Sequence, residues 1–139
     1  MQSRLLDCHH SFHALPLWVR LWVAGILIPV NVLPFFLLHT ETGRWAALAA
    51  LLVVATNMPI MLIERGMSRL MSVPHLIAWI PLLVWLLLRI NTEPPLAGWE
   101  RALALALIAI NGLSLVFDLI DTLRWLRGER AVPGFAAAG

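Results

Sequence analysis

Five polar side chains lie at helical spacing inside the last apolar segment of the chain, residues 101–123. They are Asn111, Ser114, Asp118, Asp121 and Thr122. At about 100° per residue, they fall within about a third of the helix circumference. A carboxylate is costly in lipid and almost always faces a protein partner, a water-filled cavity or the interface. This stripe therefore predicts a membrane helix with one face that needs a partner other than lipid.

Further ionisable side chains lie near the ends of the other apolar segments, at a depth similar to that of the two carboxylates. They are Arg20, Glu64, Arg65, Arg69 and His75. Charged groups gathered at one depth in the membrane could form a proton or ion relay, or a vestibule for anions. Alternatively, the carboxylates pair with Arg20, Arg65 or Arg124 and fix the register of the helices. Pairing is favoured, because long side chains reach the interface at low cost.

Three asparagines, Asn31, Asn57 and Asn111, are expected at comparable depths near the centre of the bilayer. Amide hydrogen bonds between helices contribute about 0.6–2 kcal/mol each in lipid, so these residues could tie three helices together. Pro29 and Pro59 lie nearby, and the amides could satisfy the carbonyls that a proline leaves without a donor. A pore or binding site is the alternative use.

Sulfur and imidazole groups suggest a soft-metal site. Cys8, His9, His10 and His13 form one group, and Met58, Met61, Met67 and Met71 form another. Thiolate, thioether and imidazole ligands suit Cu(I), so copper handling is a less favoured alternative. Methionine also fills gaps at helix ends, and we expect no bound metal.

Haem, quinone and catalytic sites have little support. His39 and His75 are expected on opposite sides of the membrane, too far apart to ligate one haem. Nothing beyond His75 and Trp79 suggests a quinone site, so we expect no cofactor. Neither a Gly-x-Ser-x-Gly nor a His-Glu-x-x-His pattern occurs, nor does a glycine-rich phosphate loop. We expect that the protein is not an enzyme.

The composition is that of a membrane protein. Of 139 residues, 60% are hydrophobic and only 13% are charged, whereas soluble domains are about half apolar and about a quarter charged. All ten basic residues are arginines, and they lie at the ends of apolar runs. This placement is typical of interfacial anchoring, and we expect no binding to nucleic acid.

Four apolar segments, each near the roughly 20 residues that cross a bilayer, define the expected fold. They are residues 17–38, 45–63, 73–90 and 101–123, with Ser72 as the expected N-cap of the third and Pro74 in its first turn. Short connections predict an all-α membrane protein, a four-helix antiparallel up-down bundle. Residues 17–123 form this domain, between an N-terminal segment, 1–16, and a C-terminal tail, 124–139.

The arginines predict the orientation of the bundle. The N-terminus, the second connection and the C-terminus carry Arg4, Arg20, Arg65, Arg69, Arg124, Arg127 and Arg130. The opposite side carries Arg44, Arg89 and Arg101. This excess predicts that both termini are cytoplasmic.

The run that begins at Asn57 (NMPIMLIERG) and the ending that begins at Asp121 (DTLRWLRGER) resemble segments of small bacterial membrane proteins. The resemblance implies a bacterial inner membrane and no particular activity. Small residues four apart, at Ala46/Ala50 and Ala102/Ala106, would let helices approach closely.

The leading functional hypothesis is a non-enzymatic protein that acts by helix association, as an accessory subunit of a larger membrane complex or as a self-assembling bundle. Its partners would be the lipid bilayer and other membrane subunits or copies of itself. The alternative is a small homo-oligomeric channel or transporter for protons or ions that uses Asp118, Asp121 and Arg20.

Overall fold

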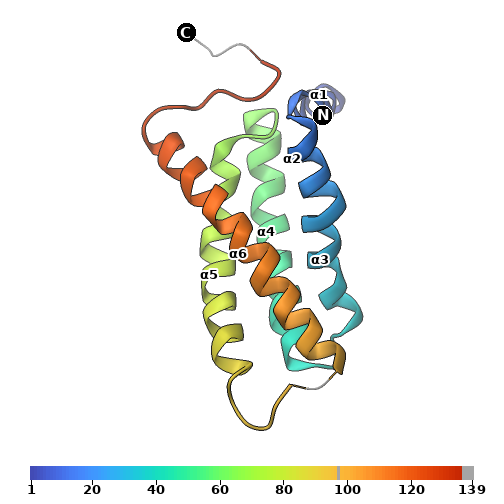
Figure 1. Ribbon diagram of the computed structural model, residues 1–139. Coiled ribbons are helices and arrows are strands. Elements are labelled where there is room, and N and C mark those ends of the chain that lie inside the picture. The colour runs from blue at the N-terminus through green and yellow to red at the C-terminus, as the bar shows by residue number, and fades with distance from the viewer. Residues whose placement is uncertain (97, 136–139) are drawn as a thin grey trace.

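The computed structural model describes residues 1–96 and 98–135, and every regular element within them is a helix (Figure 1). Four helical stretches in this part of the chain are long and apolar enough to cross a membrane. They are Leu17–Phe36, Glu41–Glu64, Arg69–Arg89 and Gly98–Leu126. The predicted all-helical chain with four long apolar segments is confirmed.

The first stretch is not a uniform α-helix. It consists of α2 (Leu17–Trp22), the π-helical η1 (Val23–Leu27), α3 (Ile28–Val32) and the 3₁₀ turn η2 (Leu33–Phe36). Proline has no N–H and cannot continue the i→i−4 ladder, so Pro29 and Pro34 disturb the regular α-helical bonding here. Departures into π and 3₁₀ geometry absorb this disturbance.

The helix α4 (Glu41–Glu64) begins four residues before the expected Trp45. The reason is a capping contact: the Gly43 N–H donates to Thr40 Oγ1 at 3.0 Å, so a polar first turn joins the helix. The helix ends at Glu64, and its C-cap residue, Arg65, adopts a left-handed conformation with φ of 58°.

A short 3₁₀ turn, η3 (Arg69–Met71), leads into α5 (Ser72–Arg89). The capping residue here is Ser68, whose hydroxyl accepts from the Leu70 N–H at 3.2 Å. The expectation that Ser72 caps this helix is wrong, because the 3₁₀ turn extends the helical stretch backwards and leaves Ser72 buried without a side-chain cap bond. Pro74 lies in the first turn, as expected.

The last helix, α6 (Gly98–Leu126), packs most extensively against α5, which in turn packs against α4. The apolar core includes four buried leucines from α5 and α6, called here the leucine layer. Its members are Leu83, Leu86, Leu103 and Leu107. Leu86, Leu107 and the adjacent Ala104 have no exposed surface.

The N-terminal helix α1 (Gln2–Ala14) lies at the end of the molecule to which the C-terminal segment returns (Figure 1). It packs on the turn after α4: Ser11 is fully buried and accepts a hydrogen bond from the Met67 N–H at 2.9 Å. A Cβ added at Gly66 would lie 2.7 Å from the Cβ of Ser11, so only glycine fits this approach. His10 donates to the Gly134 carbonyl at 3.2 Å, which connects α1 to the C-terminal segment.

Candidate functional site

The polar stripe of α6 faces the interior of the same chain. Asn111, Ser114 and Asp118 are buried, and Asp121 and Thr122 are half-buried. The partner that the stripe requires is therefore supplied by neighbouring helices of this chain.

Asn31 and Asn111 form a reciprocal pair that joins α3 to α6. The Nδ2 of Asn31 donates to Asn111 Oδ1 at 2.8 Å, and the Nδ2 of Asn111 donates to Asn31 Oδ1 at 3.0 Å. Asn31 Nδ2 also donates to the Leu27 carbonyl at 2.9 Å, rather than to the Gly25 carbonyl four residues before Pro29. The expected tie between amides thus holds for two of the three asparagines.

The third asparagine, Asn57, belongs to a different cluster, centred on His75. His75 Nδ1 lies 3.0 Å from Asp118 Oδ1, and His75 Nε2 lies 3.0 Å from Asn57 Nδ2. The ring of His75 is stacked on Trp79, with centroids 4.3 Å apart and an angle of 8° between the planes. These four residues, called the His75 site, join α4, α5 and α6.

The His75 site contains buried polar atoms without hydrogen-bond partners. They are Asn57 Oδ1, Asp118 Oδ2 and Trp79 Nε1. Asn57 is 7% exposed and Asp118 is 8% exposed, so neither oxygen is simply solvated at the surface. Buried polar groups are nearly always paired, so two acceptor oxygens and one indole N–H without a partner in the protein mark the surroundings of His75 as a place where a further hydrogen bond could form.

Asp121 pairs with Arg69, with Oδ1 and Nε 3.1 Å apart. Arg69 also donates to the Glu129 carbonyl at 3.2 Å, so it links η3 to the segment after α6. Both side chains of the ion pair keep contact with water, at 27% and 42% exposed, and such a pair contributes about 0–1 kcal/mol to stability. It marks the outer boundary of the polar stripe.

The expected pairing of the two carboxylates with Arg20, Arg65 or Arg124 is wrong. Arg20 donates to His13 Nδ1 at 3.1 Å, Arg65 lies 3.7 Å from Asp7, and Arg124 lies 3.9 Å from Glu129. The left-handed turn at Arg65 and the 3₁₀ turn that follows it carry Arg69, rather than Arg65, to α6.

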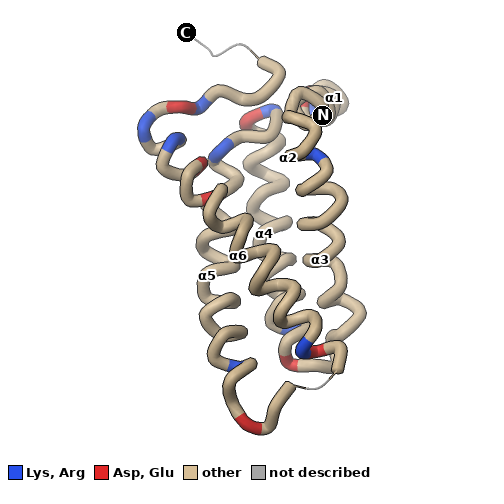
Figure 2. The backbone as a smooth tube through the Cα atoms, in the orientation of Figure 1, with Lys and Arg blue, Asp and Glu red and all other residues tan. Residues whose placement is uncertain are grey.

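Charged residues gather toward the two ends of the long helices, and the stretch between is mostly uncharged (Figure 2). At the end that carries α1, a cavity of about 730 Å³ lies between the turn after α4 and the C-terminal segment. Glu64, Arg65 and Arg69 border it together with Asp7 and Glu129. Acidic and basic groups are mixed there, so the cavity has no single charge preference.

The sulfur and imidazole residues near the N-terminus are engaged in packing. The thiol of Cys8 donates to the Met61 carbonyl at 3.3 Å, and the rings of His9 and His13 are in contact. Burial raises the pKa of the Cys8 thiol, and the negative charge of Asp7 acts in the same direction, so the thiolate that a soft metal needs is disfavoured. In residues 1–96 and 98–135, no three His, Cys, Asp or Glu side chains are grouped to hold a metal ion.

A comparison with protein-family models, curated proteins and solved structures finds no match for this chain. The chemistry of the His75 site is therefore derived from its own residues. An imidazole bonded to a carboxylate on one side and an amide on the other can hold a proton and fix its position. It can also tie three helices together.

Sequence reasoning placed His75 and Asp118 at one level but did not pair them. It grouped Trp79 with His75 only for a quinone site that had no specific support. A usable signal was present, because His75 and Trp79 are four residues apart and lie on one face of a helix. The contact with Asn57 had no such local signal, since it depends on the packing of α4 against α5.

Proposed function

We propose that this chain is a non-enzymatic, multi-pass protein of the bacterial inner membrane that acts by helix association. Its four long helices cross the bilayer as an antiparallel up-down bundle, and both termini are cytoplasmic. It associates with another membrane protein, as an accessory subunit, or with copies of itself. The apolar groove between α4 and α5 is the observation that carries the proposal.

Contacts between α5 and α6 support the antiparallel arrangement. His75, near the start of α5, meets Asp118, near the end of α6. Farther along α5, Leu83 lies beside Gly112, where a Cβ would be 3.8 Å from the leucine methyl group. Numbers rise on one helix as they fall on the other, which is the pattern of antiparallel neighbours.

Hydrogen bonds and an ion pair within one chain support a structural role for the polar stripe. Three of its five residues are paired within the chain: Asn111 with Asn31, Asp118 with His75, and Asp121 with Arg69. Beyond Asn111, the leucine layer fills the space between α5 and α6 with apolar side chains. A polar route that begins at Asp121 would stop against these leucines, so association is favoured over conduction through one chain.

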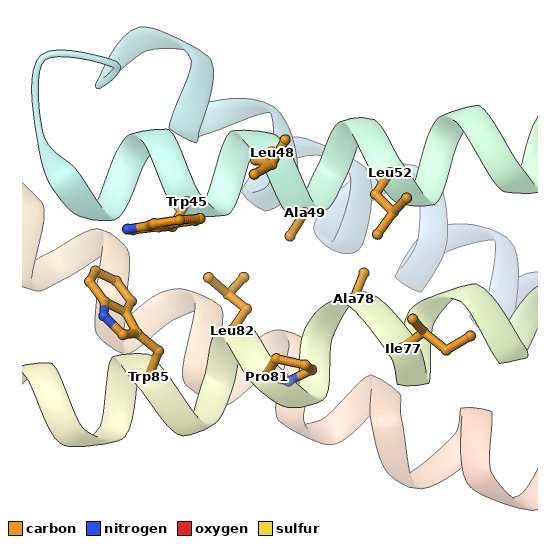
Figure 3. Close-up of a pocket in the computed structure, with 9 residues that line it drawn as sticks. All are labelled: Trp45, Leu48, Ala49, Leu52, Ile77, Ala78, Pro81, Leu82 and Trp85. Carbon is orange, nitrogen blue, oxygen red and sulfur yellow. The ribbon is translucent and has the colours of Figure 1, made fainter.

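The groove between α4 and α5 offers a surface for a partner (Figure 3). It has a volume of about 370 Å³, and its nine lining residues are all apolar: Trp45, Leu48, Ala49, Leu52, Ile77, Ala78, Pro81, Leu82 and Trp85. The rings of Trp45 and Trp85 lie at one end with centroids 6.4 Å apart. No charged residue lines the groove, so its chemistry fits an uncharged, apolar transmembrane helix.

Small residues let another helix approach the floor of this groove. Ala49 and Ala78 contribute no more than a methyl group each, while Leu48, Leu52 and Ile77 stand up at its edges. Packing, rather than the hydrophobic effect, drives helix association in lipid, and small residues beside larger ones provide that packing. The alanines at positions 46 and 50 are themselves buried, so their spacing serves contacts within the chain.

The test is purification from native membranes in mild detergent followed by mass spectrometry, with two matched variants. Ile77→Trp fills the edge of the groove, and Leu87→Trp adds the same bulk on a face of α5 about 80° away, outside the nine lining residues. The two positions are 64% and 47% exposed, so both are open to the surroundings of the bundle. We expect the wild type and Leu87→Trp to be recovered in an assembly, and Ile77→Trp to lose most of it.

Recovery of the wild type as a lone monomer would contradict association. Equal loss from both variants would contradict the groove as the contact surface. Recovery with a second copy would support self-assembly, and recovery with a different subunit would support an accessory role. Either result supports association.

A further inference from the structure

We infer that the His75 site binds a proton, and that the side-chain amide of Asn57 turns over when the imidazole becomes charged. The site would then have two states, one with a neutral and one with a charged ring, both held between α4 and α6. This role goes beyond association and can be measured on the isolated protein.

Hydrogen bonding fixes the tautomer of His75 in the present structure. An amide nitrogen only donates, so Asn57 Nδ2 requires His75 Nε2 to be a bare acceptor. A neutral imidazole carries one proton, which must then be on Nδ1 and is donated to Asp118 Oδ1. This arrangement of donors and acceptors corresponds to a neutral ring beside a carboxylate.

The unpaired atom of Asn57 provides the second state. Its Oδ1 is buried and has no partner while Nδ2 faces the ring. If a proton from water binds Nε2, that nitrogen becomes a donor and can no longer accept from Asn57. Rotation of the amide by about half a turn exchanges its oxygen and nitrogen, so that Nε2–H donates to Oδ1 and the contact is kept.

The surroundings can hold a charged ring. Asp118 Oδ1 is in contact with Nδ1, and Asp118 Oδ2 has no partner within the protein. The face of Trp79 lies parallel to the imidazole at 4.3 Å, a position in which an indole attracts a cation. Both contacts remain available to a charged ring.

Other charged groups lie toward the same end of the elements that pack against α5. Asp121 of α6 is paired with Arg69 of η3, and Glu64 lies at the end of α4. The Arg69–Asp121 pair is partly exposed, and the side chain of His75 is itself 17% exposed. A proton can therefore exchange with water from this end of the molecule.

The test is nuclear magnetic resonance of the ¹⁵N-labelled full chain in lipid nanodiscs, between about pH 8 and about pH 5, where histidine changes charge. His75→Gln identifies the His75 signals. We expect Nε2 to gain a proton as the pH falls, and the side-chain amide signals of Asn57 to move in the same titration. The amide of Asn111, paired with Asn31, is the internal control and should not follow His75.

Two variants test the role of the carboxylate. Asp118→Asn removes the carboxylate bonded to Nδ1, so Nε2 and the Asn57 amide should lose most of their response between about pH 8 and about pH 5. Asp121→Asn, one turn away, should keep the response of the wild type, because that carboxylate contacts Arg69 and is exposed to water.

Three results would overturn the inference. The first is an Nε2 that stays bare across the titration, and the second is an Asn57 amide that does not respond when Nε2 gains its proton. The third is an equal effect of the two aspartate variants. The first two measurements do not involve Asp118→Asn, so they hold even if that variant does not fold.

Discussion

Replacing Asp118 with leucine is expected to lower the free energy of unfolding by about 3 kcal/mol. The change removes the carboxylate that accepts from His75 Nδ1–H, so a charge-assisted hydrogen bond is lost. It also leaves a buried donor without an acceptor, which is costly. Unfolding by sodium dodecyl sulfate in mixed micelles, followed by the fluorescence of the seven tryptophans, measures the change.

Two controls accompany this measurement. Asp121→Leu removes an exposed ion pair and should cost less than about 1 kcal/mol. The double variant His75→Leu/Asp118→Leu replaces both polar partners with apolar side chains, and most of the lost stability should return. An Asp118→Leu variant as stable as Asp121→Leu would show that the His75 site does not hold the helices together.

The leucine layer gives the second large effect: Leu86→Ala is expected to lower the free energy of unfolding by about 2 kcal/mol. Leu86 has no exposed surface and packs between α5 and α6, so its truncation leaves a cavity. The same micelle titration measures it. In lipid, most of this cost is lost packing, because lipid tails are as apolar as leucine.

Leu88→Ala is the matched control, since it lies on the same helix and is 65% exposed. Its side chain faces the surroundings of the bundle, so truncation should change the stability by less than about 0.5 kcal/mol. An equal loss of stability at the two positions would mean that Leu86 is not packed inside the bundle.

The four long helices could be predicted from the sequence because apolar runs of about 20 residues carry a strong signal. The interruptions inside Leu17–Phe36 have visible causes in Pro29 and Pro34, although their π and 3₁₀ geometry does not follow from the prolines alone. The helix α1 had no comparable signal. Its polar and apolar residues do not separate clearly into two faces, and it is held by contacts such as Ser11 with the turn at Met67.

The candidate site was predicted only in part. Helical spacing placed Asn111, Asp118 and Asp121 on one face, and the structure buries or half-buries that face inside the chain. The partners depend on three-dimensional detail that spacing does not contain. The turn after α4 decides that Arg69 rather than Arg65 reaches Asp121, and the packing of α4 on α5 decides that Asn57 meets His75.

The central claim is that neighbouring helices of the same chain contact the polar stripe of α6. Cysteines at the two paired asparagines test it directly: Asn31→Cys and Asn111→Cys are combined with Cys8→Ser and joined in intact membranes by a short, reducible bis-methanethiosulfonate cross-linker. The linker is needed because a reciprocal amide pair holds the two Cβ atoms too far apart for a direct disulfide. A protease site inserted after Thr92 separates the two positions, so a link within one chain keeps the cleaved fragments together. Asn31→Cys with Leu113→Cys, which is 48% exposed on the same helix, is the control.

We predict that the Asn31/Asn111 pair gives a monomer whose fragments remain joined after cleavage until they are reduced, and that the control pair does not. Fragments that separate, or a link that forms only between two chains, would contradict the account. The polar face of α6 would then be turned toward another protein.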